Sequence, residues 1–160
     1  KAYGMAGARV GYAIAAASLI KSFDKIRNHF GVSRMGQAGA HAALLDTEWL
    51  DYVQSEVGAA RTEITRIARE NGLQALPSAT NFVAVDCGRD GVFARAVLTA
   101  LQGLGVFVRM PGVAPLDRCI RISCGRPEDL KVLAEALPEA LRQAAPEGAA
   151  AMSGVVKKNA

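Results

Sequence analysis

The sequence predicts an α/β chain in which the end of an α/β domain is followed by a small α+β domain. Over residues 7–72, one short apolar strand precedes three helical patterns. After the Pro77–Thr80 linker the pattern becomes strand, helix, strand, strand, helix. The length of 160 residues suits part of one domain plus a small second one. An apolar fraction of 51% with 21% charged residues is typical of a globular chain and argues against a disordered one.

The first part of the chain is predicted to contain one strand followed by helices. Residues 7–15 are apolar and bounded by glycine, which is typical of a short buried strand. Ser18 is expected to cap a helix that runs to about residue 28. Ser33 is expected to open an alanine-rich helix that runs to about residue 45. Small residues such as Gly36 and Gly39 would let that helix pack closely against a neighbour.

The longest helix is predicted to begin at Asp46 or Thr47 and to end near Gly72, a natural helix stop. Its apolar residues approximate one helical stripe, and the tryptophan is expected in the core. Three tyrosines nearby are also expected to be packing residues. The stripe is Trp49, Val53, Val57, Ile64, Ile67 and Ala68, and the tyrosines are Tyr3, Tyr12 and Tyr52.

The second part of the chain is predicted to alternate strands with a helix. Residues 81–87 alternate like a strand, and residues 90–104 read as a helix closed by glycines. Residues 106–109 are predicted to form a short strand, followed by a loop that contains proline and glycine. Residues 118–124 are predicted to form another strand.

A final helix is predicted from residue 126, because Pro127 and two acidic residues stand in its first turn. Pro138 is expected to bend or break it. From Ala144 onward the sequence is rich in Ala, Gly and Lys without periodicity, so a frayed tail is expected.

Charge and hydropathy exclude two classes of protein. The net charge of +4 is modest and the basic residues are dispersed, which argues against a nucleic-acid partner. The longest apolar runs, such as Ala13–Ala17, are too short to cross a bilayer. We therefore expect neither a nucleic-acid nor a membrane partner.

The cysteines and histidines indicate reduced thiols and no metal site. Cys87, Cys119 and Cys124 form no CxxC pair, and an odd, sparse set is typical of a cytoplasmic protein. His29 and His41 stand twelve residues apart with no thiol ligand near them, which argues against zinc.

The first nine residues have the layout of a covalent cofactor site. Lys1 is followed by small residues and then by Arg9. A lysine amine can form a Schiff base with an aldehyde, small residues allow close approach of a ligand, and a guanidinium suits a phosphate. An aldehyde and a phosphate on one cofactor describe pyridoxal 5′-phosphate. Because no domain would naturally begin at such a lysine, we expect the chain to be the C-terminal piece of a longer protein.

Three segments carry a resemblance to a known family. Residues 1–12, KAYGMAGARVGY, resemble the lysine segment of fold-type-I pyridoxal-phosphate aminotransferases of the histidinol-phosphate aminotransferase-like group. Residues 77–83, PSATNFV, and residues 118–125, RCIRISCG, resemble two later segments of that group in the same order. The resemblance implies the C-terminal portion of a fold-type-I transferase.

The resemblance also implies a division into domains. Residues 1–76 would form the C-terminal part of the large cofactor-binding domain together with the long interdomain helix. Residues 77–143 would form the small C-terminal domain, and residues 144–160 a flexible tail.

The resemblance implies roles for three residues. Lys1 would attach the cofactor and move the proton at the substrate Cα, which requires a tuned lysine pKa. Arg9 would bind the cofactor phosphate. Arg121 would hold the substrate α-carboxylate, and it alternates with two isoleucines, so its side chain points away from theirs. Arg118, outside the motif, is expected to be peripheral.

Two further substrate-binding candidates are less sharply placed. Arg109 stands where related enzymes have an arginine that contacts the substrate, for example its phosphate. The loop at residues 110–115 is more apolar than a phosphate site requires, which leaves room for an aromatic amino acid. Asn81 either lines the mouth of the active site or caps the domain junction.

The predicted function is transamination between an amino acid and a 2-oxo acid through lysine-bound pyridoxal phosphate, with histidinol phosphate or an aromatic amino acid as substrate. A cytoplasmic homodimer is expected. Two alternatives stay open. The same fold serves amino acid decarboxylases, and a chain of these 160 residues alone would be a non-catalytic module.

Overall fold

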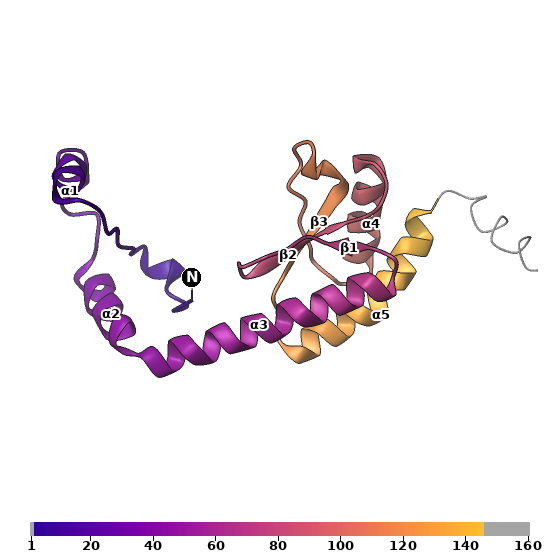
Figure 1. Cartoon of the computed structure of the whole chain (residues 1–160), viewed down its shortest axis with the longest axis horizontal. Coiled ribbons are helices and arrows are strands. Elements are labelled where there is room, and N and C mark those ends of the chain that lie inside the picture. The colour runs from indigo at the N-terminus through magenta and orange to yellow at the C-terminus, as the bar shows by residue number, and fades with distance from the viewer. Residues whose placement is uncertain (1, 146–160) are drawn as a thin grey trace, which may run out of the picture. The chain divides into compact units, whose positions relative to one another are not determined.

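The computed structural model describes residues 2–145, and the chain divides into two compact units (Figure 1). The first unit is Lys1–Glu56 and the second is Val57–Ala160. Lys1 and nearly all of the tail predicted from Ala144 lie outside the described residues. Each unit is described by itself below. The division into domains at residues 76 and 143 stays a prediction.

The first unit consists of helices and turns. Its elements are the 3-10 turn η1 (Ala6–Ala8), α1 (Ala17–Asp24), α2 (Arg34–Leu45) and the start of α3 (Thr47–Glu70). As predicted, Ser33 caps α2, and its Oγ accepts a hydrogen bond of 3.0 Å from the Gly36 amide.

The prediction that Ser18 caps α1 was wrong. Ser18 lies inside this helix, whose N-cap is Ala16 without a side-chain hydrogen bond, and the helix ends at Asp24 rather than near residue 28. Ser18 has a different role, because its carbonyl oxygen accepts a hydrogen bond from the Ser22 hydroxyl one turn later.

The predicted buried strand at residues 7–15 is absent from the described structure. Residues 6–8 form η1 instead, and residues 10–16 have no regular secondary structure. The apolar pattern alone does not make a strand, because a strand needs a neighbour for its backbone hydrogen bonds. Among residues 2–56 no other strand is present to supply one.

Large apolar side chains of the first unit are exposed. Gly36 is the only buried residue among those described before residue 57. Trp49 is 47% exposed and contacts Tyr52, with ring centroids 5.6 Å apart. The expectation that Trp49 lies in a core, and that Tyr12 and Tyr52 pack, was therefore wrong within this chain. These side chains have no second apolar layer to contact here.

The long helix α3 has the boundaries that the sequence predicted. Asp46 Oδ1 accepts a hydrogen bond of 3.0 Å from the Trp49 amide at its start. At its end Gly72 adopts a φ of 72°, and the amide of Leu73 donates to the Ala68 carbonyl over 2.9 Å. This left-handed glycine lets the chain reverse into the first strand.

The second unit contains an antiparallel sheet of three strands in the order β1-β2-β3. These are β1 (Gln74–Ala75), β2 (Phe82–Asp86) and β3 (Cys119–Ser123). Strands β2 and β3 match the sequence prediction. Strand β1 was not predicted because two residues carry no periodicity. The short strand predicted at residues 106–109 reduces to a single bridge between Arg109 and Arg121.

Two helices complete the second unit. Helix α4 (Gly91–Gly103) is capped by Asp90, whose Oδ1 accepts from the Phe93 amide over 2.9 Å. Helix α5 (Pro127–Ala144) continues through Pro138, so the predicted break does not occur. Pro138 is exposed, and its helix is anchored by buried residues on both sides of it, such as Leu133 and Ala140. That packing offsets the missing backbone donor.

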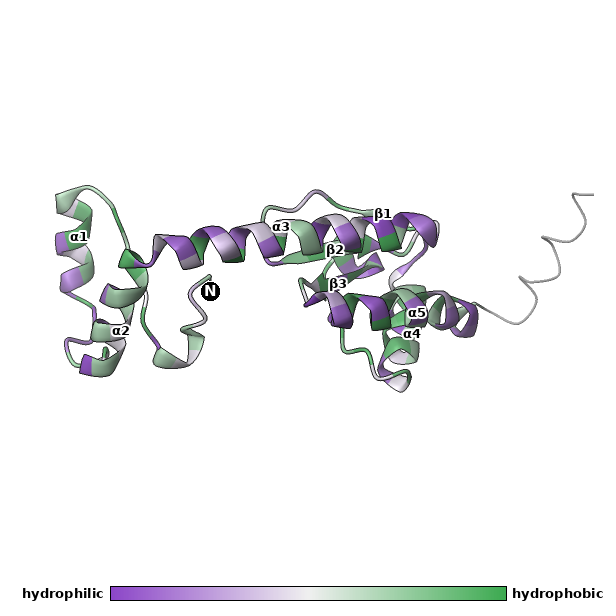
Figure 2. Cartoon of the chain, turned by 90° about the horizontal axis from the view of Figure 1, so that it is seen from below, coloured by the Kyte–Doolittle hydropathy of each residue, from purple (hydrophilic) through white to green (hydrophobic). Residues whose placement is uncertain are grey.

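The core of the second unit lies between one face of the sheet and three helices. Val83, Val85, Ile120 and Ile122 are at most 5% exposed and share a cluster with buried residues of α3, α4 and α5. Helix α5 carries hydrophilic and hydrophobic residues along its length, as a helix with one buried face requires (Figure 2). No helix among residues 2–145 is long and apolar enough to cross a membrane.

Candidate functional site

The candidate site is centred on Arg121 in β3, on the sheet face opposite the helices. Ile120 is fully buried and Ile122 is 5% exposed, while Arg121 between them is half-buried on the other face. This is the alternation that the sequence predicted. Arg121 pairs with Ala84 of β2 on one side and with Arg109 on the other.

Arg109 lies directly beside Arg121 in the ladder. The Arg109 amide donates to the Arg121 carbonyl over 3.2 Å, and the Arg121 amide donates back over 2.6 Å. Directly opposed residues of an antiparallel pair present their side chains on the same face, and like charges there repel each other. The pair therefore concentrates positive charge on the open face of the sheet, where an anion would relieve the repulsion.

The Nε of Arg121 is buried and has no hydrogen-bond partner among the described residues. An unpaired buried donor is costly, and native structures usually satisfy such groups. The Arg121 guanidinium carbon lies 4.8 Å from the centre of the Phe82 ring. This guanidinium is therefore covered on one face and lacks a partner for a buried N–H.

The turn before β2 holds Phe82. The Ser78 hydroxyl donates to the Phe82 carbonyl over 2.6 Å, and the Phe82 amide contacts Thr80 Oγ1 at 3.4 Å. Phe82 was not among the predicted site residues, although the sequence carries a signal for it. With a period of two, Phe82 and Ala84 alternate with the buried Val83 and Val85 and so share the open face.

Asn81 is exposed at the start of β2, and its carbonyl accepts a hydrogen bond of 2.9 Å from the Cys124 amide. This bond ties the beginning of β2 to the end of β3. Whether the Asn81 side chain lines a substrate site stays a prediction.

Arg118 is engaged elsewhere on the sheet. Its Nε donates to Asp86 Oδ1 at the far end of β2 from Phe82. Arg118 therefore already has a carboxylate partner within the chain, whereas the Arg121 Nε does not.

Arg9 belongs to the first unit and has an unusual backbone. Its φ is 52° and its ψ is 44°, the one positive φ at a non-glycine position among residues 2–145. Such a conformation costs about 1 kcal/mol or more and is concentrated at functional sites. The side chain is exposed, and its Nη1 donates to the Ala6 carbonyl over 2.9 Å.

Two glycines of α2 allow the segment around Arg9 to lie close to that helix. A Cβ on Gly36 would stand 3.1 Å from the Ala8 carbonyl oxygen, and one on Gly39 would stand 2.8 Å from the Met5 methyl carbon. The small residues of α2 thus serve close packing, as predicted, but against a loop rather than a second helix.

Lys1, the predicted cofactor lysine, lies outside the described residues. Arg109 and Arg121 face each other across a β-bridge, and Asn81 directly precedes β2 of the same sheet. Arg9 belongs to the first unit. The roles predicted for these residues in binding substrate and cofactor stay predictions.

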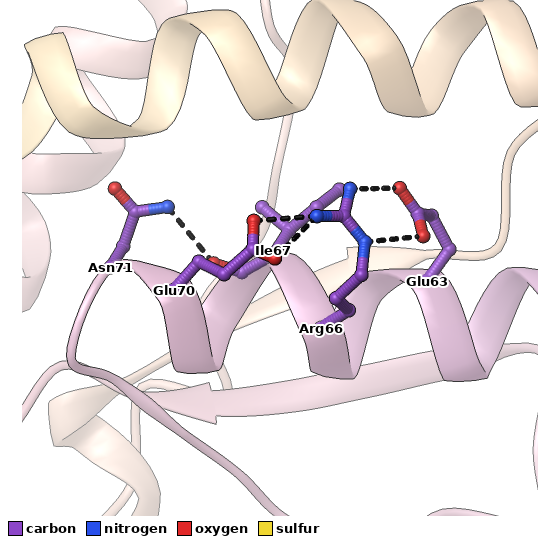
Figure 3. Close-up of polar contacts among 5 residues, drawn as sticks. All are labelled: Glu63, Arg66, Ile67, Glu70 and Asn71. Carbon is purple, nitrogen blue, oxygen red and sulfur yellow. Dashed lines mark hydrogen bonds and ion pairs between the residues drawn. The ribbon is translucent and has the colours of Figure 1, made fainter.

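One hollow of the second unit does not include these residues. It is an open groove of about 880 Å³ along α3, lined among others by Arg61, Arg66 and Arg69. Arg66 is paired there with Glu63 and Glu70, each at 2.5 Å (Figure 3). The hydrogen bond from Arg66 lowers the pKa of the Glu63 carboxyl. Arg66 therefore already has two carboxylate partners, whereas the Arg121 Nε has none among the described residues.

The cysteines have the character of packing residues. Burial raises the pKa of Cys87 to about 11 and also raises that of Cys119. Both thiols are free, and no group of three or more His, Cys, Asp or Glu within residues 2–145 could hold a metal ion.

Comparisons with known proteins give a consistent answer. The family described as aminotransferase class I and II matches residues 1–137. A histidinol-phosphate aminotransferase 2 of Ralstonia nicotianae is 42% identical over 144 residues, which are 90% of this chain and 38% of that protein. The chain thus spans about two fifths of the length of its relatives.

Solved structures agree with the fold. The histidinol-phosphate aminotransferase of Sinorhizobium meliloti in complex with pyridoxal-5′-phosphate has a TM-score of 0.86 and 54% identity, over 91% of this chain and 40% of that one. The L-threonine-O-3-phosphate decarboxylase of Porphyromonas gingivalis has a TM-score of 0.72 with 21% identity, over 88% of this chain and 44% of that one. The second likeness concerns the fold alone.

Proposed function

Since this chain belongs to the family of class I and II aminotransferases, we propose that the complete protein is a pyridoxal-phosphate-dependent aminotransferase. It moves an amino group between an amino donor and a 2-oxo acid. The observation that carries the proposal is the Arg109–Arg121 pair, in which two arginines face each other across a β-bridge and the buried Nε of Arg121 lacks a partner among the described residues. A carboxylate or phosphate of the substrate supplies that partner.

The substrate class follows from that charge. Histidinol phosphate carries a phosphate where an amino acid carries its carboxylate, and the 2-oxo acid carries a carboxylate, so one guanidinium pair serves both half-reactions. The names of the relatives support histidinol phosphate. An aromatic amino acid is the second candidate, because the exposed Phe107 and Val113 lie close to Arg109 in the sequence.

The cofactor, when bound, supplies an electron sink for the carbanion that forms at the substrate Cα. Lys1 attaches it and moves the Cα proton, and Arg9 holds its phosphate. Arg9 fits this role in one respect that the structure describes. Its left-handed backbone stands in a glycine-rich turn, and its guanidinium is exposed with a single hydrogen bond to the chain. Arg121 and Arg109 orient the substrate, and Asn81 lines the site mouth.

We extend the proposal to a cytoplasmic homodimer. The free thiols of Cys87, Cys119 and Cys124 support a reducing compartment. Large apolar side chains of the first unit are exposed, and such side chains are usually covered by another protein surface, which supports association with a partner. Examples are Ile14, Phe30 and Met35. Sedimentation of the complete protein tests the dimer, and a monomer at micromolar concentration would contradict it.

The experiment on function uses the complete protein with pyridoxal phosphate supplied. The unchanged protein should show a cofactor absorbance band near the visible edge, which Lys1→Ala abolishes and Arg121→Gln retains. Arg121→Gln should raise KM for the amino donor at least about 30-fold, because it removes a charged partner of the substrate anion. If the unchanged protein shows no cofactor band, the enzyme proposal fails.

A decarboxylase of the same fold, the alternative that the sequence left open, stays the second candidate, because a fold does not choose between the two reactions. Product analysis separates the two reactions. A ketone (from histidinol phosphate) or a 2-oxo acid (from an amino acid) formed in proportion to the consumed donor supports transamination, while release of carbon dioxide from an amino acid supports decarboxylation.

A further inference from the structure

We propose that Phe82 is a positioning residue for Arg121, which holds the guanidinium in the orientation that receives the anionic end of the substrate. This inference rests on the proposed function. Phe82 contacts Arg121 and would act on the substrate only through that side chain.

The sheet register brings the two side chains together. Phe82 stands opposite Ser123 and Arg121 opposite Ala84, so Phe82 and Arg121 are diagonal neighbours on one face. The Arg121 guanidinium carbon lies 4.8 Å from the ring centre. A guanidinium within about 6 Å of a ring centre is attracted to the aromatic face.

The ring itself is anchored through its backbone. Ser78 Oγ donates to the Phe82 carbonyl over 2.6 Å and accepts from the Thr80 amide over 3.1 Å. Thr80 Oγ1 lies 3.2 Å from the same carbonyl and 3.4 Å from the Phe82 amide. The hydroxyls of Ser78 and Thr80 thus hold the carbonyl and the amide of Phe82 in place. The position of the ring on β2 is fixed with them.

This arrangement reduces the cost of binding an anion. A free arginine side chain loses rotamer entropy when a ligand immobilises it. The contact with Phe82 orders Arg121 beforehand, and a cation–π contact uses none of the hydrogen-bonding capacity of the guanidinium. The N–H groups therefore stay available for a carboxylate or phosphate.

The chain offers a matched control in a second stacked pair. The Arg89 guanidinium carbon lies 4.6 Å from the centre of the Phe93 ring at the start of α4. Phe93 is also half-buried and packs against the core. Replacing Phe93 by leucine removes the same ring and the same kind of contact in the same unit, without touching Arg121.

The experiment compares four variants of the complete protein, Phe82→Leu, Phe82→Tyr, Ser78→Ala and Phe93→Leu. KM and kcat are measured for the amino donor, and the dissociation constant of glutarate, a simple dicarboxylate, is measured by calorimetry. Phe82→Leu should raise KM and the glutarate constant about tenfold while kcat changes less than about threefold. Phe82→Tyr keeps the ring and should restore both values.

Ser78→Ala keeps the ring but loosens its anchor, and it provides the test if Phe82→Leu fails to fold. It should raise the glutarate constant about threefold. Phe93→Leu should leave KM and the glutarate constant unchanged. The positioning role is wrong if Phe82→Leu and Ser78→Ala weaken glutarate binding no more than Phe93→Leu does.

Arg121→Gln separates the two proposals. If it weakens glutarate binding but Phe82→Leu does not, only the positioning role is lost. If Arg121→Gln itself leaves KM and glutarate binding unchanged, the substrate role of Arg121 in the proposed function is wrong.

Discussion

Asp86 and Arg118 form an ion pair across the ends of β2 and β3, with the Arg118 Nε 2.9 Å from Asp86 Oδ1. The same carboxylate oxygen accepts a hydrogen bond of 2.7 Å from the Gly88 amide. The Asp86 side chain is 19% exposed, so this carboxylate is more sheltered than most surface acids. It joins the turn after β2 to Arg118, which directly precedes β3 and stands three residues before Arg121.

We expect Asp86→Ala to destabilise the protein by about 1–3 kcal/mol, because the Gly88 amide and the Arg118 guanidinium both lose their acceptor. Asp86→Asn keeps an acceptor oxygen and should cost less. Chemical denaturation of the complete protein measures both changes. Equal losses for the two variants would show that charge, rather than the hydrogen bonds, dominates this pair.

We expect Cys87 to resist modification in the folded protein. Its pKa is about 11 because the thiol is buried, and the thiolate is the reactive form, so at pH 8 only about one thiol in a thousand is ionised. Reactivity should rise with pH towards that value. Alkylation followed by peptide mass analysis measures it, with the urea-unfolded protein as the reference. Equal rates in the folded and unfolded protein would contradict the burial of Cys87.

We expect Pro138→Ala to stabilise the protein by about 2 kcal/mol. Proline inside a helix costs about 3 kcal/mol relative to alanine, and part of this gain is offset because alanine loosens the unfolded chain. Pro138 is exposed, so the substitution leaves no cavity. The exposed Glu135→Ala on the same helix is the control and should change the stability little. A loss of stability in Pro138→Ala would mean that packing around α5 depends on the proline ring.

Helices with a clear cap and stop were predictable from the sequence. Ser33 and Asp90 cap α2 and α4 as their residue types indicate, and Gly72 ends α3 with a positive φ. Strands β2 and β3 were predictable because period-two alternation extends over all five residues of β2 and over residues 120–123 of β3. Local sequence was enough to predict an element where that element forms its own backbone hydrogen bonds, as a helix does, or shows a clear periodic pattern, as these strands do.

Features that depend on distant neighbours were not predictable. The apolar segment at residues 10–16 looks like a strand but has no partner among the described residues, and Trp49 has no core to enter. The Arg109–Arg121 pairing depends on register between segments twelve residues apart, which no local pattern specifies. The stacking of Phe82 on Arg121 depends in turn on that same sheet.

Substitutions on the two faces of the sheet have different consequences for the second unit. Val83, Val85, Ile120 and Ile122 belong to the core, so exchanges there are tested by folding. Phe82, Ala84, Arg121 and Ser123 stand on the other face and contribute no residue to that core. If Arg121 binds the substrate as proposed, substitutions at every second position of these two strands can change ligand preference while the core stays unchanged.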